Sequence, residues 1–273
     1  MDDLPRSTER NSLIRLNRYL AQCGLGARRK CDELIAAGHI FVNGEKVTGL
    51  GTKVDPEKDA IEYRGKRVKP VRKLEYLAYF KPRGVMVTRN DPEKRETVYD
   101  ALRKAGIDAD HLNYVGRLDY ASEGLLLLTN DGDLVHALTH PRFHIKKVYR
   151  VRLGKPLRDE DRNRLIQGVV SEGQVLHAGN VRVYSQAESR DRAVRGADRE
   201  TGEQYWYEVD LYEGKNRQIR RMFEELGYDI RRLRRVQFGS VKIGELNAGE
   251  CRKLTEREIA GLKASGYKNS GER

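Results

Sequence analysis

The sequence predicts an α+β protein with a mixed, mainly antiparallel sheet, preceded by a small N-terminal module. Strand-like segments outnumber helical ones and do not alternate with them regularly, a pattern that disfavours a parallel α/β sheet. The chain contains no glycine-rich phosphate loop and no dinucleotide-binding fingerprint. Two short helical patterns followed by a hairpin signal stand together near the N-terminus, and this indicates a separate unit.

Basic residues exceed acidic ones: the 273 residues include 53 Lys and Arg against 41 Asp and Glu, a net charge of +12. Because both signs are mixed and hydrophobic periodicity recurs, we expect a folded protein whose partner is a polyanion. A membrane is the weaker alternative, since the sequence has no run of eighteen or more apolar residues. Residues 1–5 are acidic and lack the apolar core of a secretion signal, so we expect a cytoplasmic protein.

Neither disulfides nor a metal site is expected. The chain has three cysteines: Cys23, Cys31 and Cys251. They fit neither an even-numbered disulfide framework nor a closely spaced pair of metal ligands. Three histidines recur every four residues, at His136, His140 and His144. Pro141 prevents a regular helix across them, so surface or turn-lining histidines are the better interpretation.

The N-terminal module is assigned to residues 13–70, after a polar and flexible segment at 1–12. Leu13, Leu16 and Leu20 recur at helical spacing, and Gly24 is a suitable end for that helix. The predicted elements are, in order, helices at 15–23 and about 27–37 and strands at 40–42 and 46–47. Asn43-Gly44 between the two strands is a strong hairpin signal.

The second domain is predicted to span residues 74–255, after a link at 70–73, with a C-terminal tail at 256–273. Its predicted elements are strands at 74–80, 85–88, 147–153 and 204–212 and helices at 133–138 and 219–226. Residues 186–204 are charged and are expected to form an exposed loop. Alternation in the third strand places Tyr149 on the inward face with Val151 and Leu153.

The reaction centre is expected at Gly116-Arg117-Leu118-Asp119, a glycine-arginine turn that presents a carboxylate. An apolar run, Leu125-Leu126-Leu127-Leu128, follows and closes on an Asn-Asp-Gly turn, which predicts a buried strand behind the acid. Taken alone, Asp119 is as well explained by an aspartate that caps a turn. Only the other motifs favour a site.

The N-terminal module resembles the small RNA-binding domain named after ribosomal small-subunit protein four, hereafter S-four-like. The matching segments are Arg15-Leu16-Asn17-Arg18-Tyr19-Leu20-Ala21, Gly24, Arg28-Arg29-Lys30, Ile35, Gly38 and Val42-Asn43-Gly44. Arg28, Arg29 and Lys30 at the start of the second helix would contact RNA phosphates; a solvated basic face is the alternative. Ala27 departs from the pattern, which usually has a capping Ser there, and a lost cap costs about 1 kcal/mol.

Four motifs follow one another in the second domain: Lys81-Pro82-Arg83-Gly84, the Asp119 turn with Glu123-Gly124, the strand 147–151, and Glu213 to Met222. In this order they resemble the motifs of the ribosomal RNA pseudouridine synthases. Residues 89–93 with Thr97-Val98 are most similar to the branch that modifies 23S RNA of the large subunit. The resemblance implies the pseudouridine synthase fold and the isomerisation of uridine to pseudouridine, without metal, redox or nucleotide cofactor.

The family's active-site residues fall on three positions: Asp119, Tyr149 and Arg220. The resemblance makes Asp119 the carboxylate nucleophile, Arg220 its cationic partner, and Tyr149 a stacking platform for the flipped uracil that could also assist proton removal. Each has an ordinary alternative. Arg220 would form an exposed pair with Glu224, worth about 0.3–0.5 kcal/mol, and Tyr149 would be plain core.

The RNA would be gripped by further basic residues. The candidates are Lys81, Arg117, Arg28, Arg29, Lys30, Arg217, Arg221, Arg234 and Arg235. Lys81 and Arg117 are expected to position phosphates or the turn. The expected partner is ribosomal RNA or a ribosomal precursor particle, bound by a monomer. The alternatives are a synthase for 16S RNA and a ribosome assembly factor that binds RNA without catalysis.

Overall fold

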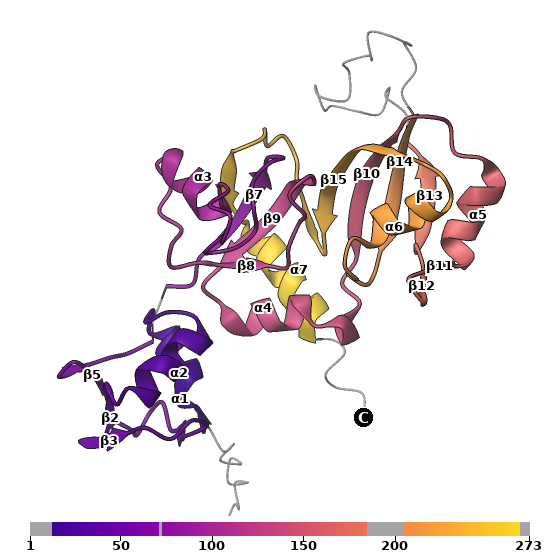
Figure 1. Ribbon diagram of the computed structural model, residues 1–273. Coiled ribbons are helices and arrows are strands. Elements are labelled where there is room, and N and C mark those ends of the chain that lie inside the picture. Colours follow the sequence, from indigo (N-terminus) through magenta and orange to yellow (C-terminus); the bar gives the residue numbers. More distant parts are fainter. Residues whose placement is uncertain (1–12, 71–72, 185–204, 268–273) are drawn as a thin grey trace, which may run out of the picture. The chain divides into compact units, whose positions relative to one another are not determined.

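The computed structural model describes residues 13–70, 73–184 and 205–267 and divides into two compact units, Met1–Leu74 and Glu75–Arg273 (Figure 1). The division falls beside the link predicted at 70–73. The segment 1–12, predicted to be flexible, and the loop predicted at 186–204 lie outside the described residues. Each unit is described by itself below.

The first unit has the predicted order of two helices and a hairpin. Its elements are β1 (Ile14–Arg15), α1 (Leu16–Gln22), α2 (Arg28–Ala36), β2 (Ile40–Val42), β3 (Glu45–Val47), β4 (Lys53–Val54), β5 (Ile61–Tyr63) and β6 (Lys66–Arg67). Asn43 and Gly44 adopt φ angles of 53° and 83°, which a tight β2–β3 turn requires. Ala27 precedes α2 without a side-chain cap, as the sequence predicted.

The second unit is built on a nine-stranded sheet. Seven strands follow the order β13 (Asn180–Val183), β14 (Tyr205–Leu211), β10 (Lys147–Leu153), β15 (Ile230–Phe238), β9 (Glu123–Thr129), β7 (Tyr76–Lys81) and β17 (Cys251–Lys253). The short strands β8 (Asn113–Val115) and β16 (Val241–Lys242) pair with β9 and β15. Strands β15 and β9 are parallel and the other neighbours are antiparallel, which confirms a mixed, mainly antiparallel sheet.

Helices cover both faces of this sheet. They are α3 (Val98–Lys104), α4 (Gly132–Thr139), α5 (Asp159–Gln167), α6 (Gln218–Glu225) and α7 (Glu256–Tyr267), with the short 3-10 turn η1 (Pro141–Phe143) and the hairpin of β11 (Val169–Ser171) and β12 (Gln174–Leu176). Figure 1 shows α6 beside β10 and β14, and α4 near α7. Pro141 ends α4, so no continuous helix joins His136, His140 and His144.

Two sequence predictions about this unit are wrong. Residues 85–88 do not form a strand, because Val85 and Val87 turn into the core while Met86 makes only an isolated bridge to Thr97. The predicted tail at 256–273 begins with helix α7, whose Leu262 is only 1% exposed and belongs to the core with Leu134 and Phe238 of the same unit. Residues 256–267 are therefore part of the domain.

The sheet presents two different faces. On the face here called the front, α3 packs over β7 and β9 through Tyr79 and Leu126, and α6 packs over β10 and β14 through Met222. On the back, α4 and α7 cover Ala78 and Leu127. Because alternate residues of a strand point to opposite faces, each strand serves both cores.

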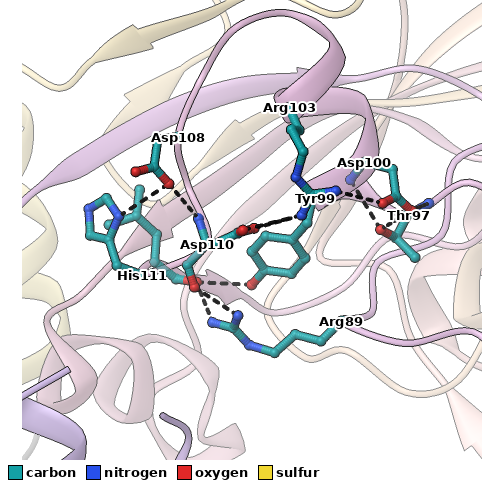
Figure 2. Close-up of polar contacts among 9 residues, drawn as sticks. Arg89, Thr97, Tyr99, Asp100, Arg103, Asp108, Asp110 and His111 are labelled. Atoms are coloured by element: carbon teal, nitrogen blue, oxygen red, sulfur yellow. Dashed lines mark hydrogen bonds and ion pairs between the residues drawn. The ribbon is translucent and has the colours of Figure 1, made fainter. Parts of the chain in front are cut away.

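A polar network fastens the segment between β7 and β8 (Figure 2). Arg89 donates hydrogen bonds to the backbone oxygens of Asp110 and Leu112 at 2.9 and 2.7 Å, and its guanidinium lies 4.6 Å from the centre of the Tyr99 ring. Thr97 and Asp100 form a capping box at the start of α3. The network holds the approach to β8, and the Asp119 turn follows β8 directly.

Candidate active site

Asp119 lies in a short turn between β8 and β9, at the place the sequence predicted. Gly116 opens the turn with a φ of 69°, a conformation that favours glycine. Leu118 is 7% exposed and anchors the turn in the front core, and the Ser122 amide donates a hydrogen bond to the Asp119 carbonyl at 3.0 Å. Asp119 itself is half-buried, so part of the residue remains accessible to a substrate.

Gly124 explains why this motif contains a second glycine. It pairs with Arg235 in the parallel contact between β9 and β15, at a φ of 106°. A Cβ added here would lie 2.3 Å from the Arg235 carbonyl oxygen, far inside contact distance. Any side chain at Gly124 would therefore separate β9 from β15 and displace the turn ahead of it.

Lys81 is fully buried beneath the turn. Its Nζ donates hydrogen bonds to the Pro82 carbonyl at 2.7 Å and to the Ser122 carbonyl at 2.8 Å. Burial lowers the pKa of Lys81 to about 8, against the opposing effect of the Asp119 and Glu123 carboxylates. Of the two roles expected for Lys81, the structure supports the positioning of the turn.

Arg220 reaches the same turn from α6. Its Nη2 donates to the Ala121 carbonyl at 3.2 Å and to Ser122 Oγ at 3.4 Å. Within the described residues no ion pair shorter than 4.0 Å joins it to Asp119. Glu224, its expected alternative partner, instead pairs with Arg217 at 3.4 Å. Arg220 therefore forms hydrogen bonds to the Asp119 turn. Among the described residues it does not form the expected exposed ion pair with Glu224.

The electrostatics place Arg220 near the acid. Burial lowers the pKa of Arg220, the cations Arg217 and Arg83 lower it further, and Asp119 raises it. Its Nε is buried and has no hydrogen-bond partner among the described residues. An unsatisfied charged donor in a buried position is costly, and an acceptor that arrives with substrate, or the Asp119 carboxylate itself, would satisfy it.

Arg235 supports the other end of the turn. Its Nε donates to the Leu125 carbonyl at 2.8 Å and its Nη1 to the Arg117 carbonyl at 3.5 Å. Together, Lys81, Arg220 and Arg235 bind the backbone of residues 117–125 through carbonyl oxygens. Since the cations are held by carbonyls, the Asp119 carboxylate remains available while lying in a positive environment.

Tyr149 joins this site through the sheet. Tyr149 is the partner of Arg235 in the ladder between β10 and β15, and Arg235 is the partner of Gly124. Residues directly opposite each other point to the same face, so Tyr149 lies on the front face beside the turn that carries Asp119. The ring is half-buried and packs against both front clusters, and its hydroxyl has no hydrogen-bond partner among the described residues.

Four of the residues that the sequence predicted as RNA contacts are buried in the structure. Lys81, Arg221, Arg234 and Arg235 have exposed fractions of 0%, 8%, 3% and 2%. Arg221 binds the Ser171 carbonyl at 2.7 Å, and Arg234 pairs with Glu123. The sequence shows that these positions are basic, but it does not show that the fold covers them. In this structure their side chains bind backbone carbonyls, carboxylates and Ser171.

The remaining basic candidates are accessible. Arg28, Arg29 and Lys30 lie exposed at the start of α2. In the second unit, Arg117 and Arg217 are both exposed, and they lie in the Asp119 turn and directly before α6. Arg217 adopts a left-handed conformation with a φ of 46° immediately before α6. These five side chains stay candidates for phosphate contacts.

Two contributors to the site were not predicted from the sequence. Ser122 is buried and offers both its carbonyl and its hydroxyl to the cations. Glu123 is 3% exposed and accepts hydrogen bonds from Arg232 and Arg234, both at 2.7 Å. A charged residue at the head of an otherwise apolar strand was the available signal, because such a charge must be paired when it is buried.

The cysteines Cys23, Cys31 and Cys251 are free thiols. Within the described residues, no group of three or more His, Cys, Asp and Glu side chains suitable for a metal ion occurs. In the same part of the chain no helix has the length and apolar character needed to cross a membrane.

Fold and site together define a class: an S-four-like nucleic-acid-binding module joined to a catalytic domain with a carboxylate above buried cations. Comparison with known families agrees. Residues 75–225 match the RNA pseudouridylate synthase family and residues 14–61 match the S4 domain. The chain therefore belongs to the RNA pseudouridine synthases, enzymes that isomerise uridine in RNA.

Individual relatives support this assignment over nearly the whole chain. An uncharacterized RNA pseudouridine synthase of Aquifex aeolicus is 34% identical over 93% of this chain and 96% of its own length. Ribosomal large subunit pseudouridine synthase B of Bacillus subtilis is 34% identical over 92% of this chain and 96% of its own. A crystal structure of a pseudouridylate synthase is similar at a TM-score of 0.59 and 26% identity, covering 91% of this chain and 99% of that one.

Proposed function

We propose that this protein isomerises a specific uridine in 23S RNA of the large ribosomal subunit, with Asp119 as the nucleophile. The observation that carries the catalytic assignment is the turn at 117–125, whose carbonyls are held by Lys81, Arg220 and Arg235 while Asp119 stays half-buried and partly open to a substrate. The large-subunit target is supported by the Bacillus subtilis relative, which is named for that subunit. The substrate is either free ribosomal RNA or the RNA of a ribosomal precursor particle.

The chemistry requires one bond to be exchanged for another. The bond from ribose C1′ to N1 of uracil breaks, the base turns, a bond from C1′ to C5 forms, and the proton on C5 is lost while N1 gains one. Asp119 attacks C1′ as a carboxylate, so that an ester bond to the sugar forms as the bond to N1 breaks, and this ester bond breaks again when C5 bonds to C1′. Arg220 and Lys81 place positive charge near that carboxylate.

Tyr149 receives the flipped base. Extracting a uridine from folded RNA costs a few kcal/mol, and stacking on an aromatic ring recovers about 1–3 kcal/mol per base. A half-buried ring fixed between two core clusters loses little conformational freedom on binding. Stacking is therefore the first role of Tyr149, and its unpartnered hydroxyl is available for proton transfer from C5.

The accessible basic residues bind the RNA around the target. Arg117 lies in the Asp119 turn, and Arg217 lies three residues before Arg220. In the first unit, the RNA contacts are Arg28, Arg29 and Lys30. The protein acts as a monomer in the cytoplasm. Light scattering of the purified chain, alone and with RNA, tests the monomer.

The test is Asp119→Asn, which keeps the shape of the side chain and removes its nucleophilic charge. We expect RNA binding to be retained and pseudouridine formation on 23S fragments to be abolished, as measured by tritium release or by chemical mapping of pseudouridine. Mapping ribosomal RNA from cells with and without the gene identifies the uridine. Undiminished product from the variant would exclude Asp119 as the nucleophile.

A binding-only assembly factor is the alternative from another class. Such a factor would support ribosome assembly equally well with Asp119 intact or with the Asp119→Asn substitution, because nothing in its action depends on the carboxylate. A synthase whose target lies in 16S RNA would lose product on the small-subunit RNA instead. The same map of modified uridines distinguishes all three.

A further inference from the structure

The back of the sheet carries a large polar cavity that the isomerisation does not use. Its volume is about 850 Å³, and it lies over β13, β14, β10 and β15, bounded by the segment 242–248. Arg150 lines it, whereas Tyr149, the preceding residue of β10, belongs to the front face. The middle of the sheet thus has a site on its front and a cavity directly behind it.

Basic side chains outnumber acidic ones in the described lining. The five basic side chains are Arg150, Arg182, Arg232, Arg234 and Lys242. Among the described residues, two carboxylates line the cavity, Glu208 and Glu245, and the buried Glu123 behind it neutralises one more charge. Asp210 also lies 3.8 Å from Arg182, and among the described residues the five cations still exceed these four carboxylates by one charge.

Two arginines share the carboxylate of Glu208, so part of the hydrogen-bonding capacity of Arg150 is not used. Glu208 accepts from Arg150 Nε at 3.1 Å and also binds Arg182, so one carboxylate serves two arginines. The Arg150 guanidinium is further fixed against the Tyr184 ring, 4.0 Å from its centre. Within the described residues, neither terminal amino group of Arg150 has a hydrogen-bond partner, although the side chain is only 20% exposed.

A rigid guanidinium with two free amino groups matches the two oxygens of a phosphate group. The pocket volume lies within the range of sites that hold nucleotide-sized ligands. Arg182 and Lys242 stand at the exposed rim, where they would contact neighbouring phosphates. We propose that this cavity binds the phosphate backbone of an RNA segment outside the target site, with Arg150 as the central phosphate ligand.

This second RNA site goes beyond the isomerisation and rests on the RNA substrate of the enzyme. Its test uses the full chain in an Asp119→Asn background, so that binding is measured without turnover and a failure does not depend on the catalytic assignment. The ligands are a 23S RNA fragment, UTP and inorganic phosphate. The variants are Arg150→Gln, Arg150→Lys and Lys242→Gln, and the control is Arg257→Gln, an arginine of α7 outside the cavity.

Arg150→Gln should weaken RNA binding about 3- to 10-fold near 0.1 M salt and lower the slope of log K against log salt by about 0.7 to 0.9. Arg150→Lys should keep the slope but lose part of the affinity, since an ammonium does not bind phosphate bidentately. Lys242→Gln, which removes a rim charge, should give a smaller loss of affinity. Arg257→Gln should match the parent protein.

Unchanged affinity and slope in Arg150→Gln and Lys242→Gln would overturn the proposal. If Arg150→Gln loses its fold, as judged by circular dichroism, Lys242→Gln decides alone. Should UTP or inorganic phosphate raise the melting temperature in an Arg150-dependent way while RNA affinity is unaffected, the ligand is a free phosphate compound and the RNA assignment is wrong.

Discussion

Two arginine-rich segments of this protein look alike in sequence and differ in structure. Arg28-Arg29-Lys30 at the start of α2 is exposed to solvent. Strand β15 also contains a dense basic run, yet Arg234 and Arg235 in it are 3% and 2% exposed and bind Glu123 and backbone carbonyls. The first segment can bind a polyanion, and the second positions the active-site turn. Charge in a sequence therefore identifies a binding surface only when the fold leaves it exposed.

The exposed and the buried segment also differ in what their charges contribute to stability. An exposed ion pair contributes little, about 0–1 kcal/mol, because water competes for both partners. A buried charge without its partner costs several kcal/mol. Substitutions in the β15 region should therefore change stability and catalysis, whereas substitutions at the start of α2 should change RNA affinity.

The largest effect is expected for Glu123→Gln. It leaves Arg232 and the buried Arg234 without their shared carboxylate, and breaking a buried pair costs about 3–5 kcal/mol. Urea unfolding measures the loss. The control is Glu224→Gln, which breaks the exposed pair with Arg217 and should cost less than about 1 kcal/mol. Equal losses in the two variants would contradict the contrast.

Lys81→Met should remove the pH dependence of stability that the buried ammonium of Lys81 causes. The pKa of Lys81 is lowered to about 8 from 10.5, so between these values the unfolded chain binds more protons than the folded one. Below pH 8 the folded protein carries the whole cost of burying the charged ammonium, and this cost falls as the pH rises to 10.5. The stability of the wild-type protein should therefore rise over this range by up to about 3 kcal/mol relative to the variant. Parallel stability curves for the two proteins would show that Lys81 is not a buried ammonium.

Arg220→Ala should reduce turnover about 100-fold, or about 2.7 kcal/mol, because it removes a preorganised cation beside Asp119. RNA affinity should change little. Arg220→Lys should recover part of the activity by restoring the charge. Single-turnover kinetics at saturating RNA give the measurement. Glu224→Gln should leave turnover unchanged, and a loss equal to that of Arg220→Ala would restore the surface-pair interpretation of Arg220.

The smallest effect on stability is expected at the exposed segment. Replacing Arg28, Arg29 and Lys30 together by Gln should change the free energy of unfolding by less than about 0.5 kcal/mol. RNA affinity should fall about 10-fold, and the salt slope should fall by about 0.7 for each lost contact with single-stranded RNA. Lys58→Gln, an exposed lysine of the same unit, is the control. An unchanged salt slope in the triple variant would leave the α2 segment as a solvated face.

Local patterns determined much of this protein. Apolar spacing predicted α1 and α6, alternation predicted β10 and β14, and Asn43-Gly44 predicted the hairpin. These elements depend on interactions between residues a few positions apart, which the sequence displays directly. The ordered motifs also indicated the family and the turn at Asp119, because a turn of this kind needs particular residues at consecutive positions.

The tertiary structure alone decided which charges are covered. Whether Arg235 is a surface residue depends on β15 lying parallel to β9 and antiparallel to β10, and these pairings join residues far apart in the sequence. The same long-range contacts bring Lys81 and Arg220 to the carbonyls of the Asp119 turn and fold residues 256–267 onto the core. Burial is a property of the assembled sheet, so no local pattern contains it.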